Sequence, residues 1–505
     1  MILHLTPLNL SSRKDFLPMR ALIHCLLYFS FSCCVFGQSD KPNFLFVLAD
    51  DCTYLDLEVY GGQAKTPNLN KLASEGMTFN RCYEAASMCS PTRHNLYTGI
   101  YPIHSGSYPN HTFANPGAKS IVHHLKTAGY RVALLGKTHI EPKSVFPFEY
   151  LEGMEYGYDD NRKTPEGSAV IRNPNLKRFI EECTESGTPF CVFAASYDPH
   201  GPYTRGDSSV YKPSELSLPP NIYDTPNHRE NYSKYLAECS FFDSQVGECL
   251  SYLREFEVEN STLVLVATEQ GSSFPFGKWN NYETSVHSGL IARWPGKIAA
   301  GSQSDAIVEY GDVVPTFVEA AGARLVSEID GKSFLDILTG KATNHKTYAY
   351  ASQTFSGVNG NKEPYGMRTI VNRNYRYIRN LKPSVPITYS QTGGFTPKLK
   401  PESSGWRGEI VRMAQSGDQS AKDYINKMVY RPAKELYDIN ADPFCLDNLI
   451  DREELSGVKN ELSLGLDRWM GDQGDLGWET ELNGSERTKK TSKLWRDIRE
   501  AEALR

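Results

Sequence analysis

The sequence has no excess of basic residues. It carries 54 Lys and Arg against 60 Asp and Glu, for a net charge of −6 and a pI near 6.1. A nucleic-acid-binding protein normally shows a basic footprint, so the charge balance argues against a nucleic-acid partner. There is also no C-x-x-C pair typical of a zinc site, and neither an internal repeat nor a low-complexity segment. The 505 residues, 40% hydrophobic and 23% charged, are ordinary for a globular protein with a large core.

A membrane span is not indicated either, because the one long apolar stretch is short and interrupted. This stretch, residues 21–31, follows the basic Arg20 and leads to small residues ending at Gly37. Such an order is typical of a signal peptide. We therefore expect residues 1–37 to be a leader and Gln38 the mature start, with export to the periplasm, the medium or a lysosome according to the organism. An uncleaved anchor helix is the alternative.

The cysteines do not form the evenly spaced set of a disulfide-stabilised domain. Of the eleven, three fall in the predicted leader and Cys89 belongs to the motif described below, which leaves an odd number. Cys183 with Cys191, or Cys239 with Cys249, could pair in an oxidising compartment. The sequence leaves both pairings open.

Four short runs are almost entirely apolar, as strands buried on both faces of a sheet are. Helical patterns lie between them, at 120–128 and 232–256, and strands that alternate with helices predict an α/β fold. The four runs are 44–48, 132–135, 190–195 and 263–267.

Polar and ionisable residues follow each of these four runs. In open α/β sheets the carboxyl ends of the strands build the functional site. Four such groups on one sheet edge are hard to explain as solvated surface. The groups are Asp50-Asp51, Gly136-Lys137-Thr138-His139, Tyr197-Asp198-Pro199-His200 and Thr268-Glu269-Gln270-Gly271.

The character of the chain changes after about residue 340. Short strand-like runs at 348–351, 368–371, 375–378 and 435–438 precede a helical pattern at 453–470, which predicts a small antiparallel sheet with a terminal helix. We therefore expect a main domain at 38–342, a C-terminal subdomain at 343–470 and a peripheral polar tail at 471–505.

A compact motif begins at Cys89 and ends at Gly99. Pro91 suits the first turn of a helix, Ser90 can cap it and Gly99 can close it. Cys89 then lies at the helix N-terminus, where free N–H groups favour an anion, and Arg93 follows one turn later. A buried structural thiol and a catalytic thiolate are the alternative interpretations.

A second chemical set consists of Asp50, Asp51, Glu269 and Gln270 at two strand ends. Ligands that are all oxygen atoms favour calcium or magnesium over zinc. A cap or turn would explain the two aspartates alone. With two more oxygen donors on another strand end, a divalent cation is the better interpretation.

Several motifs together carry a family resemblance. Cys-x-Pro-Thr-Arg followed by Leu-x-Thr-Gly resembles the signature of type I sulfatases of the alkaline phosphatase superfamily. Further motifs match in the family's order: 41–51, 66–73, 136–139, 199–202, 277–279, 435–438 and 442–449. The resemblance implies an alkaline-phosphatase-like fold, a mixed and mostly parallel sheet between helices with a smaller C-terminal antiparallel sheet. Residues 38–342 are then the catalytic domain.

The resemblance also implies a modified nucleophile. In these enzymes a formylglycine-generating enzyme converts the cysteine, here Cys89, to formylglycine (3-oxoalanine). Its hydrate binds the metal and attacks sulfur, and the covalent sulfate leaves as the aldehyde forms again. The implied metal ligands are Asp50, Asp51, Glu269, Gln270 and residue 89 itself, and the implied ion is Ca²⁺, with Mg²⁺ as the alternative.

The remaining roles follow from the same resemblance. His139 is the expected base for sulfate release, with Arg93 and Lys137 holding the hydrated aldehyde. Lys278 and His200 are expected to hold the sulfate group, and one of them protonates the leaving group. We also expect Lys137, which lies two residues before His139, to share one face with it in an extended segment.

The chain departs from the family at two positions. Most relatives carry Asp and then Asn or His where this sequence has Glu269 and Gln270, whose side chains are one methylene longer. The oxygen donors remain, so the departure changes site geometry and affinity. Three lesser candidates, His94, Glu283 and His287, are equally explained by structural roles.

The expected substrate is a sulfate ester or sulfamate of a sulfated glycan. Chain size and the Cys-Ser-Pro context resemble heparan N-sulfatases distantly, and the choice between O- and N-sulfate stays open. The alternatives are a phosphomonoesterase or phosphodiesterase of the same superfamily, and an inactive relative that only binds sulfated glycan. The sequence does not indicate an oligomeric state.

Overall fold

A computed structural model describes residues 41–151, 174–355, 364–387 and 405–503. The predicted leader lies outside these residues, so the signal peptide stays a prediction. Within the described ranges, no helix has both the length and the apolar character needed to cross a membrane.

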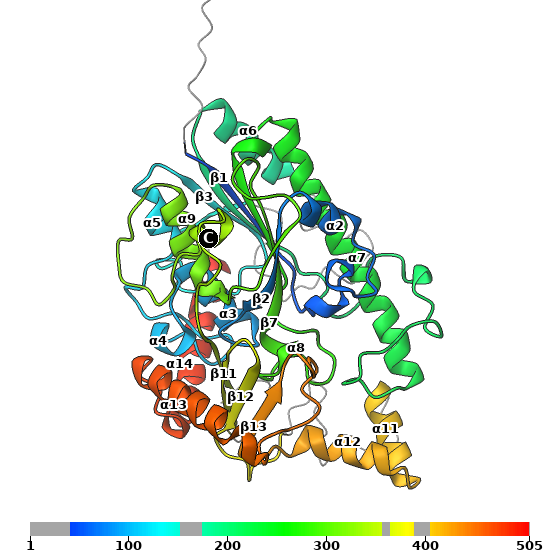
Figure 1. The fold of residues 1–505 in the computed structure, drawn as a ribbon. Coiled ribbons are helices and arrows are strands. Elements are labelled where there is room, and N and C mark those ends of the chain that lie inside the picture. Colours follow the sequence, from blue (N-terminus) through cyan, green and yellow to red (C-terminus); the bar gives the residue numbers. More distant parts are fainter. Residues whose placement is uncertain (1–40, 152–173, 356–363, 388–404, 504–505) are drawn as a thin grey trace, which may run out of the picture. The chain divides into compact units, whose positions relative to one another are not determined.

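The main sheet has nine strands, and the four predicted runs are its adjacent central members. β3, β5, β1 and β6 are mutually parallel, whereas β7 runs antiparallel to both β6 and β2. This mixed, mostly parallel sheet confirms the expected α/β class (Figure 1). Its order is β4 (Glu149–Leu151), β3 (Arg131–Gly136), β5 (Phe190–Ala195), β1 (Asn43–Leu48), β6 (Thr262–Ala267), β7 (His287–Arg293), β2 (Met77–Tyr83) and β8 (Ser302–Ser304), with β9 (Val308–Glu309) also paired to β2.

Helices cover both faces of this sheet, which explains the continuous apolar strands. Phe44, Phe46 and Leu48 of β1 pack on one side, and Leu45 and Val47 pack on the other. The first face is covered by α3 (Cys89–Thr98), α5 (Ile121–Lys126), α9 (Val313–Ala320) and α10 (Leu335–Leu338). The second is covered by α2 (Pro67–Ser74), α6 (Pro174–Glu185) and α7 (Pro226–Glu255), on the opposite side of the sheet in Figure 1.

Both predicted helices are present. The predicted helix at 120–128 is α5, which Ser120 caps. The predicted helix at 232–256 is α7, which begins earlier, at Pro226, because the Thr225 side chain accepts a hydrogen bond from the His228 N–H and Pro is favoured in a first turn.

The second sheet is antiparallel, as expected. Its strands are β10 (Ala349–Thr354), β11 (Gly366–Val371), β12 (Tyr375–Asn380) and β13 (Lys434–Asp438). One face packs on α13 (Ser456–Asp472), the predicted terminal helix, and the other packs on α11 (Gly405–Gln415) and α12 (Gln419–Val429). Shorter helical elements are α4 (Pro102–Ser105), α8 (Glu283–Val286), and the 3₁₀ turns η1 (Tyr54–Asp56), η2 (Glu58–Tyr60), η4 (Ser208–Val210), η5 (Glu259–Ser261), η6 (Tyr310–Asp312) and η7 (Glu453–Leu455).

The polar tail is not peripheral at its start, contrary to the prediction for residues 471–505. Arg368 of β11 is fully buried, and it pairs with Asp475 and, at 2.9 Å, with Glu481 of α14 (Trp478–Ala503). A buried guanidinium needs carboxylate partners. The polar residues that suggested a solvated tail therefore include the two that hold α14 against the second sheet.

The eight cysteines of the described residues are all buried free thiols. The two pairings that the sequence left open, Cys183 with Cys191 and Cys239 with Cys249, are not formed in the structure. Cys191 lies within β5, and burial raises its pKa well above the usual thiol range. Such a group behaves as a small apolar side chain.

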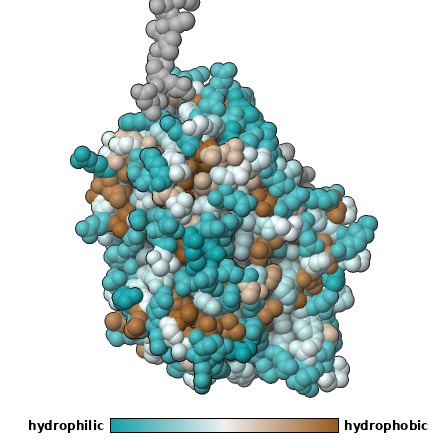
Figure 2. Space-filling view, viewed as in Figure 1, coloured by the Kyte–Doolittle hydropathy of each residue, from teal (hydrophilic) through white to brown (hydrophobic). Residues whose placement is uncertain are grey.

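The face shown in Figure 2 is largely hydrophilic, with brown residues in scattered groups. Among the exposed large apolar side chains are Leu464 and Leu476, 60% and 65% exposed. Scattered apolar residues of this kind are normal for a protein surface.

Candidate active site

The predicted site residues meet at the carboxyl edge of the main sheet. β3, β5, β1 and β6 are adjacent and parallel, so the segments that follow them lie side by side. Backbone hydrogen bonds join these segments: Asp50 N donates to the Asp198 carbonyl at 3.0 Å, and Glu269 N donates to the Ala49 carbonyl at 3.2 Å. Sheet order therefore positions the side chains of Asp50 and Glu269, which are over 200 residues apart in sequence.

Cys89 is the first residue of α3, as the motif predicted. The cap is not Ser90, however, because the helix starts at Cys89, two residues earlier than a Ser90 cap would give, and Met88 precedes it in an extended conformation. Ser90 instead donates its N–H to Oδ1 of Asn110 at 3.2 Å. Gly99 ends the helix at φ 71°, a conformation that favours glycine. The thiol is 3% exposed, at the positive end of a buried helix.

Two hydrogen-bond donors surround the Cys89 thiol. Lys278 Nζ is 3.2 Å and Gln270 Nε2 is 3.3 Å from Sγ. The same ammonium group is 2.7 and 2.9 Å from the two oxygens of Asp51. An oxygen atom at the place of this sulfur would accept from both donors more strongly than a thiol does, so the surroundings fit an oxygenated side chain at residue 89.

Buried ion pairs hold the first acidic residue in place. Lys137 pairs with Asp50, and Arg93, also within 3.8 Å of Asp50, pairs with Glu269 and donates to the Lys137 carbonyl at 2.9 Å. Burial opposes ionisation of Asp50, but Lys137, His200 and Arg93 together lower its pKa well below the usual range. Asp50 is therefore an anion at neutral pH.

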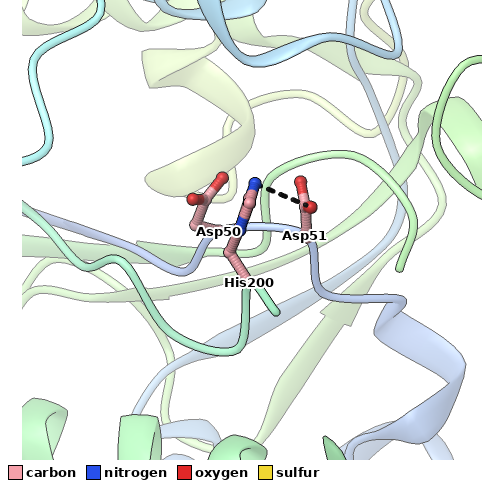
Figure 3. Close-up of side chains that lie close together, drawn as sticks. All are labelled: Asp50, Asp51 and His200. Atoms are coloured by element: carbon pink, nitrogen blue, oxygen red, sulfur yellow. Dashed lines mark ion pairs between the residues drawn. The ribbon is translucent and has the colours of Figure 1, made fainter. Parts of the chain in front are cut away.

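His200 lies with the two aspartates. Its Nε2 is 3.5 Å from Oδ2 of Asp51, and single ligand atoms of Asp50, Asp51 and His200 lie within 4.8 Å of one another. Figure 3 shows the imidazole between the two carboxylates, with a dashed line marking its contact with Asp51. Burial lowers the pKa of His200 to about 4, against the opposing effect of Asp51, so the ring is neutral near pH 7.

The oxygen donors satisfy a simple test for a hard cation. Asp50 Oδ1, Glu269 Oε1 and Gln270 Oε1 are buried and have no hydrogen-bond partner among the described residues. Unpaired buried oxygens cost free energy unless a ligand, a water molecule or an ion compensates them. The set therefore fits Ca²⁺ or Mg²⁺. In the structure the amide nitrogen of Gln270 donates to Asp51. For Gln270 and Asp51 to bind the same cation, the Gln270 amide has to rotate so that its oxygen, and not its nitrogen, faces the Asp51 carboxylate.

His139 lies partly exposed beside the buried Lys137. Its backbone has φ 50°, and its Nδ1 makes no hydrogen bond to a described residue. Burial first, and then the charges of Lys137 and His111, lower its pKa well below the usual value. The ring is thus unprotonated and able to accept a proton, as a general base requires.

Sequence reasoning missed one supporting residue, Glu84. Glu84, just after β2, is fully buried and accepts hydrogen bonds from the Gln270 N–H, from Ser288 and, at 2.9 Å, from Thr92 of α3. Burial raises its pKa to about 8. Glu84 thereby ties the segment of Gln270 to the helix of Cys89, and no motif in the sequence marks it.

Of the three lesser candidates, His94 has a structural role. Its ring spans Ser90 and Glu141: Nδ1 donates to the Ser90 carbonyl oxygen at 2.7 Å, and Nε2 accepts the Glu141 backbone N–H at 3.2 Å. Burial lowers its pKa to about 4, so the ring is neutral. Its nitrogens are therefore occupied by backbone groups.

Glu283 and His287 also belong to the packing. His287 Nδ1 is 2.8 Å from Glu283, whose other oxygen accepts from Arg376 of β12 at 2.8 Å. The pair thus joins the main sheet to the second sheet. Neither residue forms a hydrogen bond with Cys89, whose partners among the described residues are Gln270 and Lys278.

Comparison with known proteins identifies the family. The family model described as Sulfatase matches residues 42–323, more than half of the chain. The chain belongs to the sulfatase family. It is accordingly a sulfuric ester hydrolase, and a second family model, N-sulphoglucosamine sulphohydrolase, C-terminal, matches residues 271–384 of this sulfatase.

Named relatives cover most of the sulfatase. It is 30% identical over 442 residues to an ulvan-active sulfatase of Formosa agariphila, covering 87% of this chain and 82% of the relative. It is 25% identical over 483 residues to N-sulphoglucosamine sulphohydrolase of Homo sapiens, covering 87% of this chain and 90% of that one.

Solved structures show the same fold. A protein in complex with its substrate D-glucosamine-2-N,6-O-disulfate aligns with a TM-score of 0.64 at 18% identity, over 86% of this chain and 99% of that one. A phosphonate monoester hydrolase of Agrobacterium radiobacter aligns with a TM-score of 0.63 at 16% identity, over 86% and 96% of the two chains. The fold is therefore shared by sulfur and phosphorus chemistry, and the sulfatase assignment rests on the sequence relationship.

Proposed function

We propose that this sulfatase removes sulfate from a sulfated polysaccharide, as a sulfate ester or sulfamate, with a formylglycine made from Cys89 and a bound calcium ion. One observation carries the proposal. Cys89, at the N-terminus of α3, lies within 3.3 Å of Lys278 and Gln270, beside carboxylates whose free oxygens fit a hard cation.

The substrate class is supported by the relatives. One is named for activity on ulvan and another for N-sulphoglucosamine, and both align over 87% of this chain. We extend these sugars to a sulfated glycan as the substrate class of this chain. We propose that the enzyme is exported, because sulfated polysaccharides lie outside the cytoplasm. We also propose that a formylglycine-generating enzyme matures it.

The proposed cation is held by Asp50, Asp51, Glu269 and Gln270, with His200 close to the first two. When bound, it neutralises sulfate oxygens and lowers the pKa of a coordinated hydroxyl. All four ligands offer oxygen, which is why calcium, or magnesium as the alternative, fits better than zinc.

The chain's own residues then have defined tasks. The hydrated formylglycine supplies a hydroxyl nucleophile at residue 89. Lys278 and Lys137 are buried cations that bind and orient the anionic groups. His139, held unprotonated, takes a proton from the hydroxyl of residue 89 when sulfate is released. Lys278 and His200 both lie beside Asp51. The Lys278 ammonium group can protonate the departing alcohol or amine, and the neutral His200 ring can hold an oxygen of the sulfate group.

The test compares the release of sulfate with the release of phosphate in one assay. The purified enzyme, matured with a formylglycine-generating enzyme, is incubated with ulvan, heparan sulfate and an aryl phosphate, and free sulfate and phosphate are measured by ion chromatography. Sulfate release from a polysaccharide, with at most trace phosphate release, supports the proposal. Faster phosphate release, or binding of the glycan without any release, supports instead the phosphoesterase or the inactive glycan-binding alternative.

A further inference from the structure

Backbone strain marks one site residue that has no role so far. Eight non-glycine residues of the described chain have positive φ, a conformation that costs free energy and collects at functional sites. Three of the eight are predicted site residues, and two lie on either side of Lys278 in the sequence. Glu257 and Cys445 lie elsewhere. The remaining residue is His111, at φ 62°. The five site positions are Asp51, His139, Gln270, Phe276 and Trp279.

His111 lies against the proposed base. Its ring centroid is 5.3 Å from that of His139, at an interplanar angle of 77°. Both rings are partly exposed, whereas Lys137 and Lys278, whose charges act on His111, are 2% and 6% exposed. The two imidazoles therefore lie on the solvent side of the buried cations, where the sugar that carries the sulfate has to be.

The neighbouring Asn110 determines which nitrogen of His111 carries the proton. Asn110 Oδ1 accepts the Ser90 N–H at 3.2 Å, which directs its Nδ2 to His111 Nε2 at 3.3 Å. An amide nitrogen only donates, so Nε2 accepts and the proton resides on Nδ1. Nδ1 makes no hydrogen bond to a described residue.

The protonation state agrees with this tautomer. Burial, followed by the charges of Lys137 and Lys278, lowers the pKa of His111 to about 4, so the ring is neutral at pH 7. His111 thus presents one N–H donor, at a fixed position, beside the catalytic groups. The same Asn110 side chain accepts the Ser90 N–H in the first turn of α3, so the donor is fixed relative to Cys89.

We propose that His111 is a specificity-determining residue, whose Nδ1–H donates a hydrogen bond to a hydroxyl or carboxylate oxygen of the sugar that carries the scissile sulfate. The inference rests on the proposed function, because it needs a sugar as the sulfated group. The sulfate itself lies deeper, among the buried lysines. A neutral donor next to it selects the sugar without competing for the sulfate.

The test uses two substitutions that tolerate φ 62°. His111→Gly accepts the backbone conformation and removes the donor, whereas His111→Asn tolerates it and retains an amide N–H donor. Each variant is assayed on the best sulfated oligosaccharide and on 4-nitrophenyl sulfate, which has no sugar. We expect H111G to lower the ratio of kcat/KM for the oligosaccharide to that for the aryl sulfate about tenfold or more, and H111N to lower it about threefold or less.

The control is His104→Ala, in the same segment. The His104 side chain is 54% exposed and pairs with Asp330, so this variant should behave as the parent enzyme on both substrates. Thermal unfolding of all variants shows whether they fold.

Three outcomes overturn the inference in different ways. An unchanged ratio in H111G means that no sugar contact exists. Equal losses on both substrates mean that His111 only positions His139. A parent enzyme that cleaves the aryl sulfate but no sulfated saccharide refutes the proposed function, and the inference with it, before any variant is compared.

Discussion

Two groups of buried charges in this sulfatase make an instructive comparison. The seam cluster, Glu283, His287 and Arg376, joins the two sheets, and the Glu283 carboxylate uses both oxygens, one for His287 and one for Arg376. The strand-end cluster around Asp50 and Glu269 is as deeply buried, yet each of these two carboxylates has an oxygen without a hydrogen bond to the described residues.

The backbone shows the same difference. None of the three seam residues has positive φ, whereas Asp51, Gln270 and His139 at the strand ends do. The Glu283 carboxylate has both oxygens paired, so it leaves no free oxygen for a further ligand. Buried charges with unpaired oxygens on a strained backbone indicate a place where something else binds.

The largest effect expected is at residue 89. Cys89→Ala removes the precursor of the nucleophile, so sulfate release should fall by about a thousandfold or more. The matched control is Cys82→Ala, since Cys82 is as buried, at 1% against 3% exposed, but lies in the core of β2. The initial rate of sulfate release per folded molecule is measured for both variants. An active Cys89→Ala enzyme would remove the distinction between the two clusters.

At the seam, the effect should fall on stability instead. Arg376→Met leaves Glu283 as an uncompensated buried charge and should lower the free energy of unfolding by about 3–5 kcal/mol. Adding Glu283→Gln should recover part of this loss, and activity per folded molecule should remain. Urea unfolding measures the change in stability, and sulfate-release assays measure the activity per folded molecule. If Arg376→Met abolishes turnover while the protein stays folded, the seam cluster takes part in catalysis.

The seam also predicts an acid response. Burial raises the pKa of Glu283, but the Arg376 charge and the His287 hydrogen bond outweigh burial and lower it to about 2. An unfolded Glu titrates near 4.5. Stability from this ionised group is therefore complete above about pH 4.5 and is lost as pH falls toward 2, by up to about 3 kcal/mol.

The measurement is urea unfolding between pH 5.5 and 3. The parent protein should lose stability more steeply than Glu283→Gln, which has no carboxyl to titrate at this position. Parallel slopes for the two proteins would show that Glu283 does not titrate in this way.

At the strand ends, calcium itself should stabilise the protein. A ligand that binds only the folded state at 100 times its Kd adds about 2.7 kcal/mol. We expect Ca²⁺ to raise the Tm of the chelator-treated enzyme, and Glu269→Ala to lose this rise. Glu149→Gln, whose side chain is 43% exposed in a surface ion pair, is the control that should retain it. A Tm that does not respond to Ca²⁺ or Mg²⁺ would contradict a cation at the strand ends.

Much of this arrangement could be predicted from local sequence patterns. The apolar runs fixed the central strands, and sheet geometry then brought Asp50 and Glu269 to one edge. Cys89 could be placed at a helix start because Pro91 and Gly99 are local signals. These features depend on near neighbours in the chain or on a rule of sheet topology.

The rest depended on distant partners. Glu84 is one acidic residue after a strand, and only the packing of Gln270 and Thr92 around it shows its task. The tail was misread because polarity does not distinguish a solvated carboxylate from Asp475, which neutralises a buried arginine. His111 carries no motif, and its backbone strain is visible only in three dimensions.

The central claim is tested most directly by the mass of one tryptic peptide, Cys82–Arg93, from active enzyme treated with iodoacetamide. This peptide contains both Cys82 and Cys89, so it carries its own control. The account predicts a single alkylation, on Cys82, and a loss of about 18 Da at residue 89 as the thiol becomes an aldehyde. Two alkylated cysteines in an enzyme that releases sulfate at full rate would contradict it.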